Sequence, residues 1–249
     1  MISLQKWRML IEKWEEFGEV YQIPKRSKER LRNFCEVCLP HLKDKKVVEI
    51  GCNAGIFGLN IDQVAKSYIG VEPANIIRDN GKGKAKADYF KQLEVTQKEM
   101  KNGTIRNETI TDYCKNPGDI DAFVACFALY HFRDHELELL KEHVFPKCDT
   151  IIIQNRTQSR ATKRNSHKFY KDKNIIRFFN KQGFDDITVL SFRAKNGMQK
   201  FSEIIIKRNH ARNKSKSEGS TPKEIRLPTR RSTPTGQRRQ DQGSSQPLL

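Results

Sequence analysis

One nine-residue stretch constrains the fold of this chain more than any other part of it: Val-Val-Glu-Ile-Gly-Cys-Asn-Ala-Gly at residues 47–55. Its apolar beginning is typical of a buried parallel strand, and residues 56–66 follow with the spacing of an amphipathic helix. Glycines at 51 and 55 let the backbone turn sharply and let a ligand approach it closely. The first N–H groups of the helix are free to bind that ligand. The stretch therefore predicts a ligand-binding turn between a strand and a helix.

The chain continues as an alternation of strand and helix patterns. Apolar runs typical of strands occupy residues 46–51, 68–72, 104–110, 120–129, 149–155, 187–193 and 201–207. Helical patterns occupy residues 56–66, 85–100, 134–143 and 169–182. Such alternation predicts an α/β fold with a doubly wound, mostly parallel, Rossmann-like sheet. The Asn-Gly pair at 196–197 is typical of a hairpin turn, so the C-terminal strand should be antiparallel.

Two more helical patterns precede the first strand, at residues 2–20 and about 27–41. Their apolar residues recur every three or four positions, as in helices that bury one face. We expect an N-terminal helical cap at residues 1–45, an α/β domain at 46–207 and a disordered basic tail at 208–249. The tail has too few apolar residues to offset the entropy lost on ordering.

The formal net charge of +17 bears on the partners of this protein. Eleven basic and three acidic residues from Lys207 onward give the C-terminal part +8, which leaves +9 for the rest. A basic surface attracts polyanions such as RNA, DNA or acidic lipid headgroups. Lysine-rich surfaces are also common where they only keep a protein soluble, so the charge alone leaves both readings open.

Cysteine usage and hydropathy indicate the compartment. Cys35 and Cys38 form the one CxxC pair among six cysteines, and no second pair or histidine pair accompanies them, so we expect no metal site. The first residues lack the apolar core of a signal peptide. No apolar run approaches the roughly 18–20 residues of a membrane span. We expect a cytoplasmic protein, in a reducing compartment, that does not bind membranes.

The kind of ligand follows from one acidic residue and two missing glycines. Glu72 lies 21 residues beyond Gly51, where an acid hydrogen-bonds the ribose in nucleoside-cofactor sites. A dinucleotide site needs the pattern G-x-G-x-x-G, and here Asn53 and Ile56 replace the second and third glycines. S-adenosylmethionine has no phosphate and does not need that pattern. The residues therefore argue against a dinucleotide and leave two alternatives, S-adenosylmethionine or an ordinary strand–glycine–helix turn without a ligand.

These motifs resemble those of the class I S-adenosylmethionine-dependent methyltransferase family, from residue 47 to about 207. VVEIGCNAG is similar to its first motif, E-x-G-x-x-x-G, YIGVEP to its second, and IDAFVACFALYHF to the motif of its fourth strand. The resemblance implies S-adenosyl-L-methionine as the cofactor and methyl transfer as the activity. It also implies these cofactor-binding residues: Gly51, Cys52, Asn53 and Gly55 at the methionine end, Glu72 with Pro73 at the ribose, Glu108 and Thr109 at the adenine, and Cys126 and Phe127 at the sulfonium or adenine.

Methyl transfer needs alignment more than covalent help, because the sulfonium is already a good leaving group. A base is required only if the acceptor carries an acidic proton. His131, Asp134 and His135 follow the fourth predicted strand, at the edge where α/β sheets bind ligands. His131 is the candidate general base. The alternative is a histidine that bonds the backbone or caps the next helix.

Methyltransferases for several classes of acceptor have characteristic sequence motifs that this sequence lacks. It has no Asp/Asn-Pro-Pro-Tyr of exocyclic-amine DNA methyltransferases and no Pro-Cys of cytosine-C5 enzymes, and Asp121 stands at the wrong end of its strand for a cap 2′-O enzyme. RNA such as tRNA, favoured by the charge, and a small molecule remain. The connecting segment at residues 154–170 is long, basic and polar. We expect it either to guide an anionic acceptor or to form a surface loop. The rival function is a catalytically inactive Rossmann-like module that binds RNA.

Overall fold

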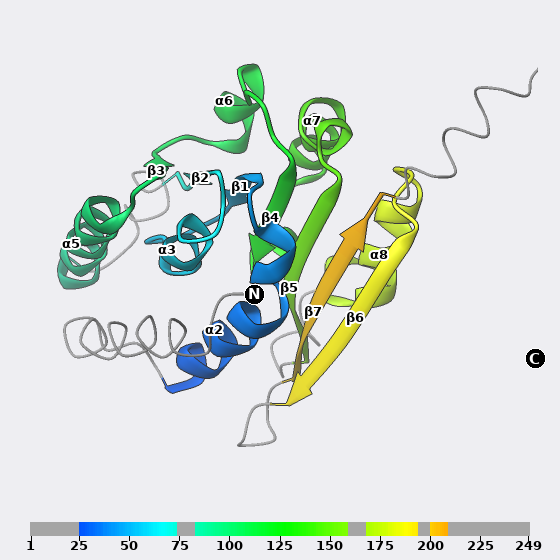
Figure 1. Cartoon of the computed structure of the whole chain (residues 1–249), viewed down its shortest axis with the longest axis horizontal. Coiled ribbons are helices and arrows are strands. Elements are labelled where there is room, and N and C mark those ends of the chain that lie inside the picture. The colour runs from blue at the N-terminus through cyan, green and yellow to red at the C-terminus, as the bar shows by residue number, and fades with distance from the viewer. Residues whose placement is uncertain (1–24, 74–82, 159–167, 194–199, 209–249) are drawn as a thin grey trace, which may run out of the picture. The chain divides into compact units, whose positions relative to one another are not determined.

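The computed structural model describes residues 25–73, 83–158, 168–193 and 200–208 (Figure 1). The chain divides into two units, Met1–Asn209 and His210–Leu249, and every described residue belongs to the first. The helix expected at residues 2–20, the Asn-Gly turn and the tail beyond Arg208 lie outside the described residues. None of the helices in the described ranges has the length and apolar character needed to cross a bilayer.

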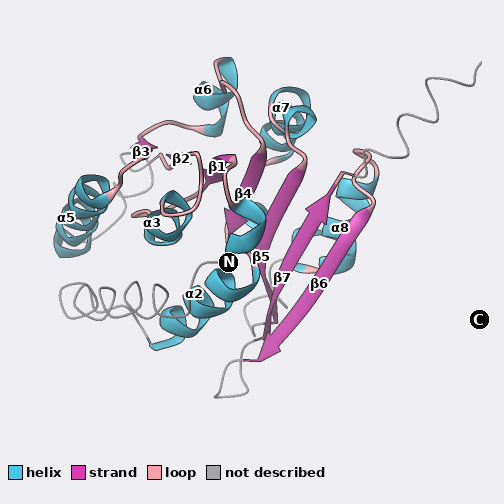
Figure 2. Ribbon diagram, in the orientation of Figure 1, coloured by secondary structure: helices cyan, strands magenta, loops and turns pink. Residues whose placement is uncertain are grey.

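The described strands form a single sheet in the order β3-β2-β1-β4-β5-β7-β6 (Figure 2). Neighbours among β1 to β5 are parallel, and β7 runs antiparallel to both β5 and β6. The predicted Rossmann-like sheet with an antiparallel C-terminal strand is therefore confirmed. The strand bounds are β1 Lys46–Ile50, β2 Ser67–Val71, β3 Gly103–Arg106, β4 Ala122–Cys126, β5 Thr150–Gln158, β6 Asp186–Arg193 and β7 Lys200–Lys207.

Helices cover both faces of the sheet, with α2 and α3 in front of it and α8 behind it in Figure 1. Successive residues of a strand point to opposite faces. In β4, Phe123 joins the core under α7 and α8, whereas Val124 joins the core under α2 and α3. The helix bounds are α2 Lys25–Val37, α3 Ile56–Asp62, α5 Gly83–Glu99, α6 Ile110–Lys115, α7 Asp134–His143 and α8 Asp172–Asn180, and the short 3-10 helices are η1 Leu39–Leu42, η2 Leu129–His131, η3 Phe145–Lys147 and η5 Lys168–Tyr170.

Several predicted elements are shorter than expected, and among them the helices expected at 56–66 and 169–182 span only Ile56–Asp62 and Asp172–Asn180. The helix expected at about 27–41 ends at Val37, and the proline that follows lies in η1. The strand expected at 104–110 ends at Arg106, because the Thr109 hydroxyl accepts the N–H of Asp112 at 3.1 Å and starts α6, a helix that the sequence did not predict. The strand expected at 120–129 ends at Cys126, and residues 129–131 form η2 instead.

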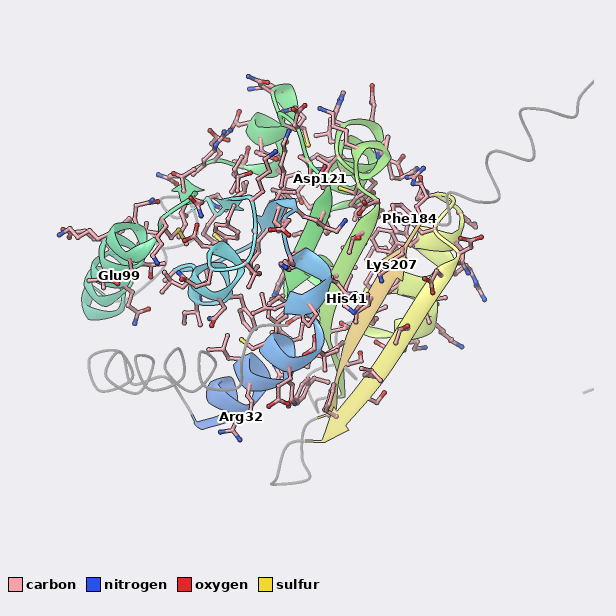
Figure 3. The ribbon with its side chains drawn as sticks, viewed as in Figure 1. Arg32, His41, Glu99, Asp121, Phe184 and Lys207 are labelled. Atoms are coloured by element: carbon pink, nitrogen blue, oxygen red, sulfur yellow. The ribbon has the colours of Figure 1, made fainter. Side chains whose placement is uncertain are left out.

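Polar contacts hold the amino ends of the parallel strands. Lys45 forms an ion pair with Asp149 at 2.8 Å, and the N–H of Lys46 donates to the Asp121 carboxylate at 2.8 Å. Figure 3 labels Asp121 at this edge, near the end of the antiparallel strand at Lys207. The opposite edge, where the parallel strands end, contains the candidate site.

The outermost strand, β6, is hydrogen-bonded only to β7 within the described residues. Val189 and Leu190 in its middle have exposed fractions of 36% and 38%, the highest among the large apolar side chains that the structure describes. This edge of the sheet is therefore open and partly apolar.

A buried polar contact joins α2 to the sheet. Gln154 of β5 and Glu203 of β7 are paired in register, and the Gln154 amide donates to the Glu203 carboxylate and to the backbone carbonyl of Arg30. The Cys38 thiol donates to the other carboxylate oxygen of Glu203 at 3.4 Å. Glu203 has no exposed surface, and this burial raises the pKa of its carboxyl to about 7.

Gly55 should be a sensitive position of the fold. It has φ +77, and a Cβ there would collide with Ile105 Cδ1 and lie 2.8 Å from Thr96 Cγ2. Gly55→Ala should lower the free energy of unfolding by roughly 2–4 kcal/mol, through backbone strain and overpacking. Gly118→Ala is the control, because Gly118 has φ +68 but a Cβ there meets nothing within 4 Å. Urea unfolding that gives equal losses for the two variants would contradict this account of Gly55.

Glu203 should make stability depend on pH. A carboxyl whose pKa is raised on folding binds its proton more tightly in the native state, so its contribution falls as pH rises from about 4.5 to about 7. In Glu203→Gln this contribution is absent, so the wild type should lose on the order of 3 kcal/mol relative to the variant across that window. Urea unfolding of both proteins between pH 4 and 8 measures the difference. A difference that does not change with pH would show that Glu203 titrates normally.

Candidate functional site

A cavity of about 830 Å³ opens where β1, β2 and β4 end. In α/β sheets, ligands bind outside the carboxyl ends of the strands. The cavity is lined by Arg30, Glu49, Ile50, Gly51, Cys52, Asn53, Ile56, Phe57, Val71, Glu72, Pro73, Thr109, Ile110, Cys126, Phe127, Ala128, His131, Phe132, Arg133 and Glu136. Its volume lies in the range of small-molecule and cofactor sites, roughly 300–1,000 Å³.

The loop between β1 and α3 forms one wall. Asn53 has φ +53, a left-handed conformation that asparagine tolerates better than most residues. This tolerance explains how asparagine can occupy a left-handed position of the loop where glycine would otherwise be favoured. Gly51, Cys52 and Asn53 line the cavity as predicted, but Gly55 does not, since it faces Ile105 and Thr96. Gly55 therefore has a packing role in this structure.

Glu72 follows β2 directly and lines the cavity with Pro73. Its carboxylate is 6% exposed and accepts the N–H of Asn53 at 3.0 Å. This hydrogen bond joins the turn after β1 to the turn after β2 and fixes the carboxylate at the cavity wall. A fixed carboxylate at this position accepts hydrogen bonds from ligand hydroxyl groups.

Cys126 and Phe127, at the end of β4, form the opposite wall. Phe127 has φ +55, which strains a residue with a large side chain. Its N–H donates to the carbonyl of Gln154 at 2.8 Å, and the guanidinium of Arg30 lies 4.5 Å from the centre of its ring. A cation over an aromatic face is attracted to it, so α2 is held over the end of β4.

The remaining predicted residues divide between the cavity and its surroundings. His131 in η2 lines the cavity and is exposed. Thr109 also lines it, although its hydroxyl is engaged as the cap of α6. Glu108 does not line it, and the neighbouring contact comes from Ile110 instead. His135 lies in α7 and is not among the lining residues.

Several residues that line the cavity were not predicted from the sequence. Glu49 lies in β1 and belongs to the first motif, so its place in that motif was a usable signal. Arg30, in α2, had none, because no pattern in the sequence pairs the helix before β1 with the end of β4. The other lining residues outside the predicted set are Ile50, Ile56, Phe57, Val71, Ile110, Ala128, Phe132, Arg133 and Glu136.

Burial sets the electrostatics of the deepest part of the cavity. Glu49 is 1% exposed, and its carboxylate accepts the hydroxyl of Tyr68 at 2.8 Å. Burial raises the pKa of Glu49 to about 7, and the nearby Glu72 adds to the shift. A cation bound here would favour the ionised form of Glu49.

The two thiols at the cavity, those of Cys52 and Cys126, are not candidate nucleophiles. Burial raises the pKa of both well above the usual value for cysteine, so both thiols are neutral at pH 7. Among the described residues, no group of three or more His, Cys, Asp or Glu side chains is arranged to hold a metal ion.

Comparisons with known proteins bear on this arrangement. No family model matches the sequence, and no curated protein matches it. Solved structures do match. N-methyltransferase NodS from Bradyrhizobium japonicum WM9, in complex with S-adenosyl-L-homocysteine, superposes with a TM-score of 0.56 at 11% identity, over 75% of this chain and 89% of that one.

Two further structures give similar values. Magnesium protoporphyrin IX methyltransferase from Synechocystis PCC 6803, with bound S-adenosyl-L-homocysteine, has a TM-score of 0.53 at 12% identity, over 80% of this chain and 94% of that one. The methyltransferase domain of bacterial CtHen1 has a TM-score of 0.51 at 12% identity, over 73% and 98%. At these identities the likeness concerns the fold. The chain has the fold of the class I S-adenosylmethionine-dependent methyltransferases.

Proposed function

We propose that this protein is an S-adenosyl-L-methionine-dependent methyltransferase. The observation that carries the proposal is the contact between Glu72 and the loop after β1: a buried carboxylate accepts the N–H of Asn53 at 3.0 Å, at the wall of an 830 Å³ cavity. A carboxylate fixed beside a glycine-containing turn suits the ribose of a nucleoside cofactor. Neighbouring structures of the same fold contain S-adenosyl-L-homocysteine.

The lining residues fit the chemical parts of this cofactor. Glu72 would hold the ribose hydroxyls, and the turn at Gly51 and Asn53 would hold the methionine end. Glu49, with its pKa raised to about 7, would balance positive charge on the ligand. Ile110 and Phe132 offer apolar surface to a base. The cofactor supplies an electrophilic methyl group bonded to a positively charged sulfur.

The same residues argue against a nicotinamide dinucleotide. A pyrophosphate needs backbone without side chains at the second and third glycines of the loop. Here Asn53 and Ile56 stand at those positions, and both line the cavity. A ligand without phosphates is not excluded by these side chains.

As the acceptor of the methyl group we propose RNA, such as tRNA, or a small molecule. The net charge of +17 favours a polyanion. His131 would act as the general base if the acceptor loses a proton, since a neutral imidazole takes up protons near pH 7. Its exposure at the cavity leaves it accessible to an acceptor that enters from solvent. The rival function, RNA binding without catalysis, predicts no methyl transfer.

Binding of the cofactor is the first test. Calorimetry should detect S-adenosyl-L-methionine binding and no binding of a nicotinamide dinucleotide. Glu72→Ala should weaken the binding by roughly 1.5–3 kcal/mol, the contribution of hydrogen bonds to a charged acceptor. Glu72→Gln is the control, because its amide oxygen can still accept the Asn53 N–H, and it should lose less. An affinity unchanged in Glu72→Ala would show that the ribose is held elsewhere, and no binding by the wild type would refute the proposal.

Turnover is the second test, measured as transfer of a radioactive methyl group to pooled cellular RNA and metabolites. His131→Ala should lower the rate by about 100-fold or more, while cofactor affinity stays within a few-fold. His135→Ala, in α7 and outside the cavity lining, should retain the wild-type rate. The opposite pattern would show that His131 is not the base, and a His131→Ala variant with a lower melting temperature and weaker binding would indicate a structural histidine.

A further inference from the structure

The outer face of α8 carries three cations at a regular spacing. Lys173, Arg177 and Lys181 follow one another at intervals of four residues, the last just beyond the helix end, and all three are exposed. Residues four apart lie one above another on a helix, so the three cations form a single stripe. The opposite face is apolar and buried, with Ile175 and Phe179 at 0% exposure.

In each of α5, α6 and α7, one lysine pairs with a carboxylate one turn away. Lys98 pairs with Glu94 in α5, Lys115 with Asp112 in α6, and Lys141 with Glu138 in α7. The three cations of the α8 stripe form no ion pair with any residue that the structure describes. In this respect α8 differs from α5, α6 and α7, whereas the sequence of α2 also has cations four residues apart, at Lys28 and Arg32.

The stripe also weakens the helix. Like charges four residues apart destabilise a helix, whereas a Glu–Lys pair at the same spacing stabilises it. Lys173 and Arg177 are such a like-charge pair, as are Arg177 and Lys181. Charges arranged against local stability are better explained by an external anion than by solubility.

The stripe starts beside the cavity. The segment η5 directly precedes α8 and packs against η2, which carries His131. Lys168 of η5 forms an ion pair with Asp134 at 2.6 Å, and Asp134 follows Arg133, which lines the cavity. A linear polyanion bound along α8 would therefore extend toward the rim of the cavity at Arg133.

We propose that α8 binds the phosphate backbone of a nucleic-acid strand that is the methyl acceptor. The inference rests on the proposed methyl transfer and names the acceptor class for it. Cations about 5–6 Å apart on one line suit successive phosphates of a strand. A membrane surface fits poorly, because helices that lie on membranes insert an apolar face, and that face of α8 is in the core.

The test compares two sets of charge reversals in the full chain. Lys173→Glu, Arg177→Glu and Lys181→Glu together should weaken binding of structured RNA by about tenfold or more, and reduce the slope of log affinity against log salt by about 2–3. The control set is Arg32→Glu, Lys66→Glu and Lys101→Glu, which changes the net charge equally at exposed positions that form no ion pair with described residues. Figure 3 shows Arg32 pointing away from the sheet. The control should change binding by less than about twofold.

Fluorescence anisotropy with an RNA and a DNA of the same sequence shows which kind of strand the protein binds. Binding to acidic phospholipid vesicles is measured in parallel, to test whether α8 binds a membrane surface instead. A neutral set, Lys173→Gln, Arg177→Gln and Lys181→Gln, should weaken RNA binding without lowering the melting temperature. Equal losses in the α8 and control sets, or a loss confined to vesicles, would overturn the inference.

Cofactor binding separates this inference from the proposed function. The α8 set should raise KM for the nucleic acid and leave the affinity for S-adenosyl-L-methionine unchanged. Loss of nucleic-acid binding in a protein that never binds the cofactor would refute the methyltransferase proposal and keep α8 as the binding surface. If the α8 set binds nucleic acid as the wild type does and the protein methylates a small molecule, the proposed role of α8 is refuted and the methyltransferase proposal stands.

Discussion

The hydrogen bonds of Gln154 hold together the parts from which the cavity is built. Its backbone carbonyl accepts the N–H of Phe127, and its side chain donates to the carbonyl of Arg30 and to Glu203. One residue of β5 thus fixes the strained end of β4, the position of α2 and the buried carboxylate of β7. Because Gln154 is 1% exposed, losing any of these partners would leave a polar group unsatisfied in the core. The wall formed by Arg30 and Phe127 depends on this anchor.

The sequence was most informative where a signal is local. Buried parallel strands are nearly continuous apolar runs, and the bounds of α7 agree with the predicted 134–143. It was least informative where one polar side chain changes the path of the chain, as Thr109 does by starting α6. Most of the residues predicted from motifs line the cavity, whereas Gly55 does not, and a glycine needed for packing looks the same in sequence as one needed for a ligand. Arg30 enters the cavity only through tertiary packing.

The two faces of the sheet differ in what they offer a ligand. On one face α2 and α3 close over the cavity, and the polar groups there are engaged with one another, as Glu49 is with Tyr68 and Glu72 with Asn53. On the other face the cations of α8 remain without carboxylate partners among the described residues. Where the polar groups of a site already hydrogen-bond to one another, a ligand must replace those hydrogen bonds in order to bind. Binding then depends mainly on how well the shape of the ligand fits the cavity. A row of cations without carboxylate partners instead attracts anions over a longer distance and discriminates little between them.

The open edge at β6 affects how this protein behaves in concentrated solution. An eight-residue edge strand with Val189 and Leu190 partly exposed has one edge that pairs with no strand in the described ranges, and a strand of another molecule can align on such an edge. Repulsion between copies that each carry +17 opposes this approach, but only over the Debye length, about 30 Å at 0.01 M salt and about 8 Å at 0.15 M. Added salt therefore shortens the range of the repulsion that keeps β6 edges of different molecules apart.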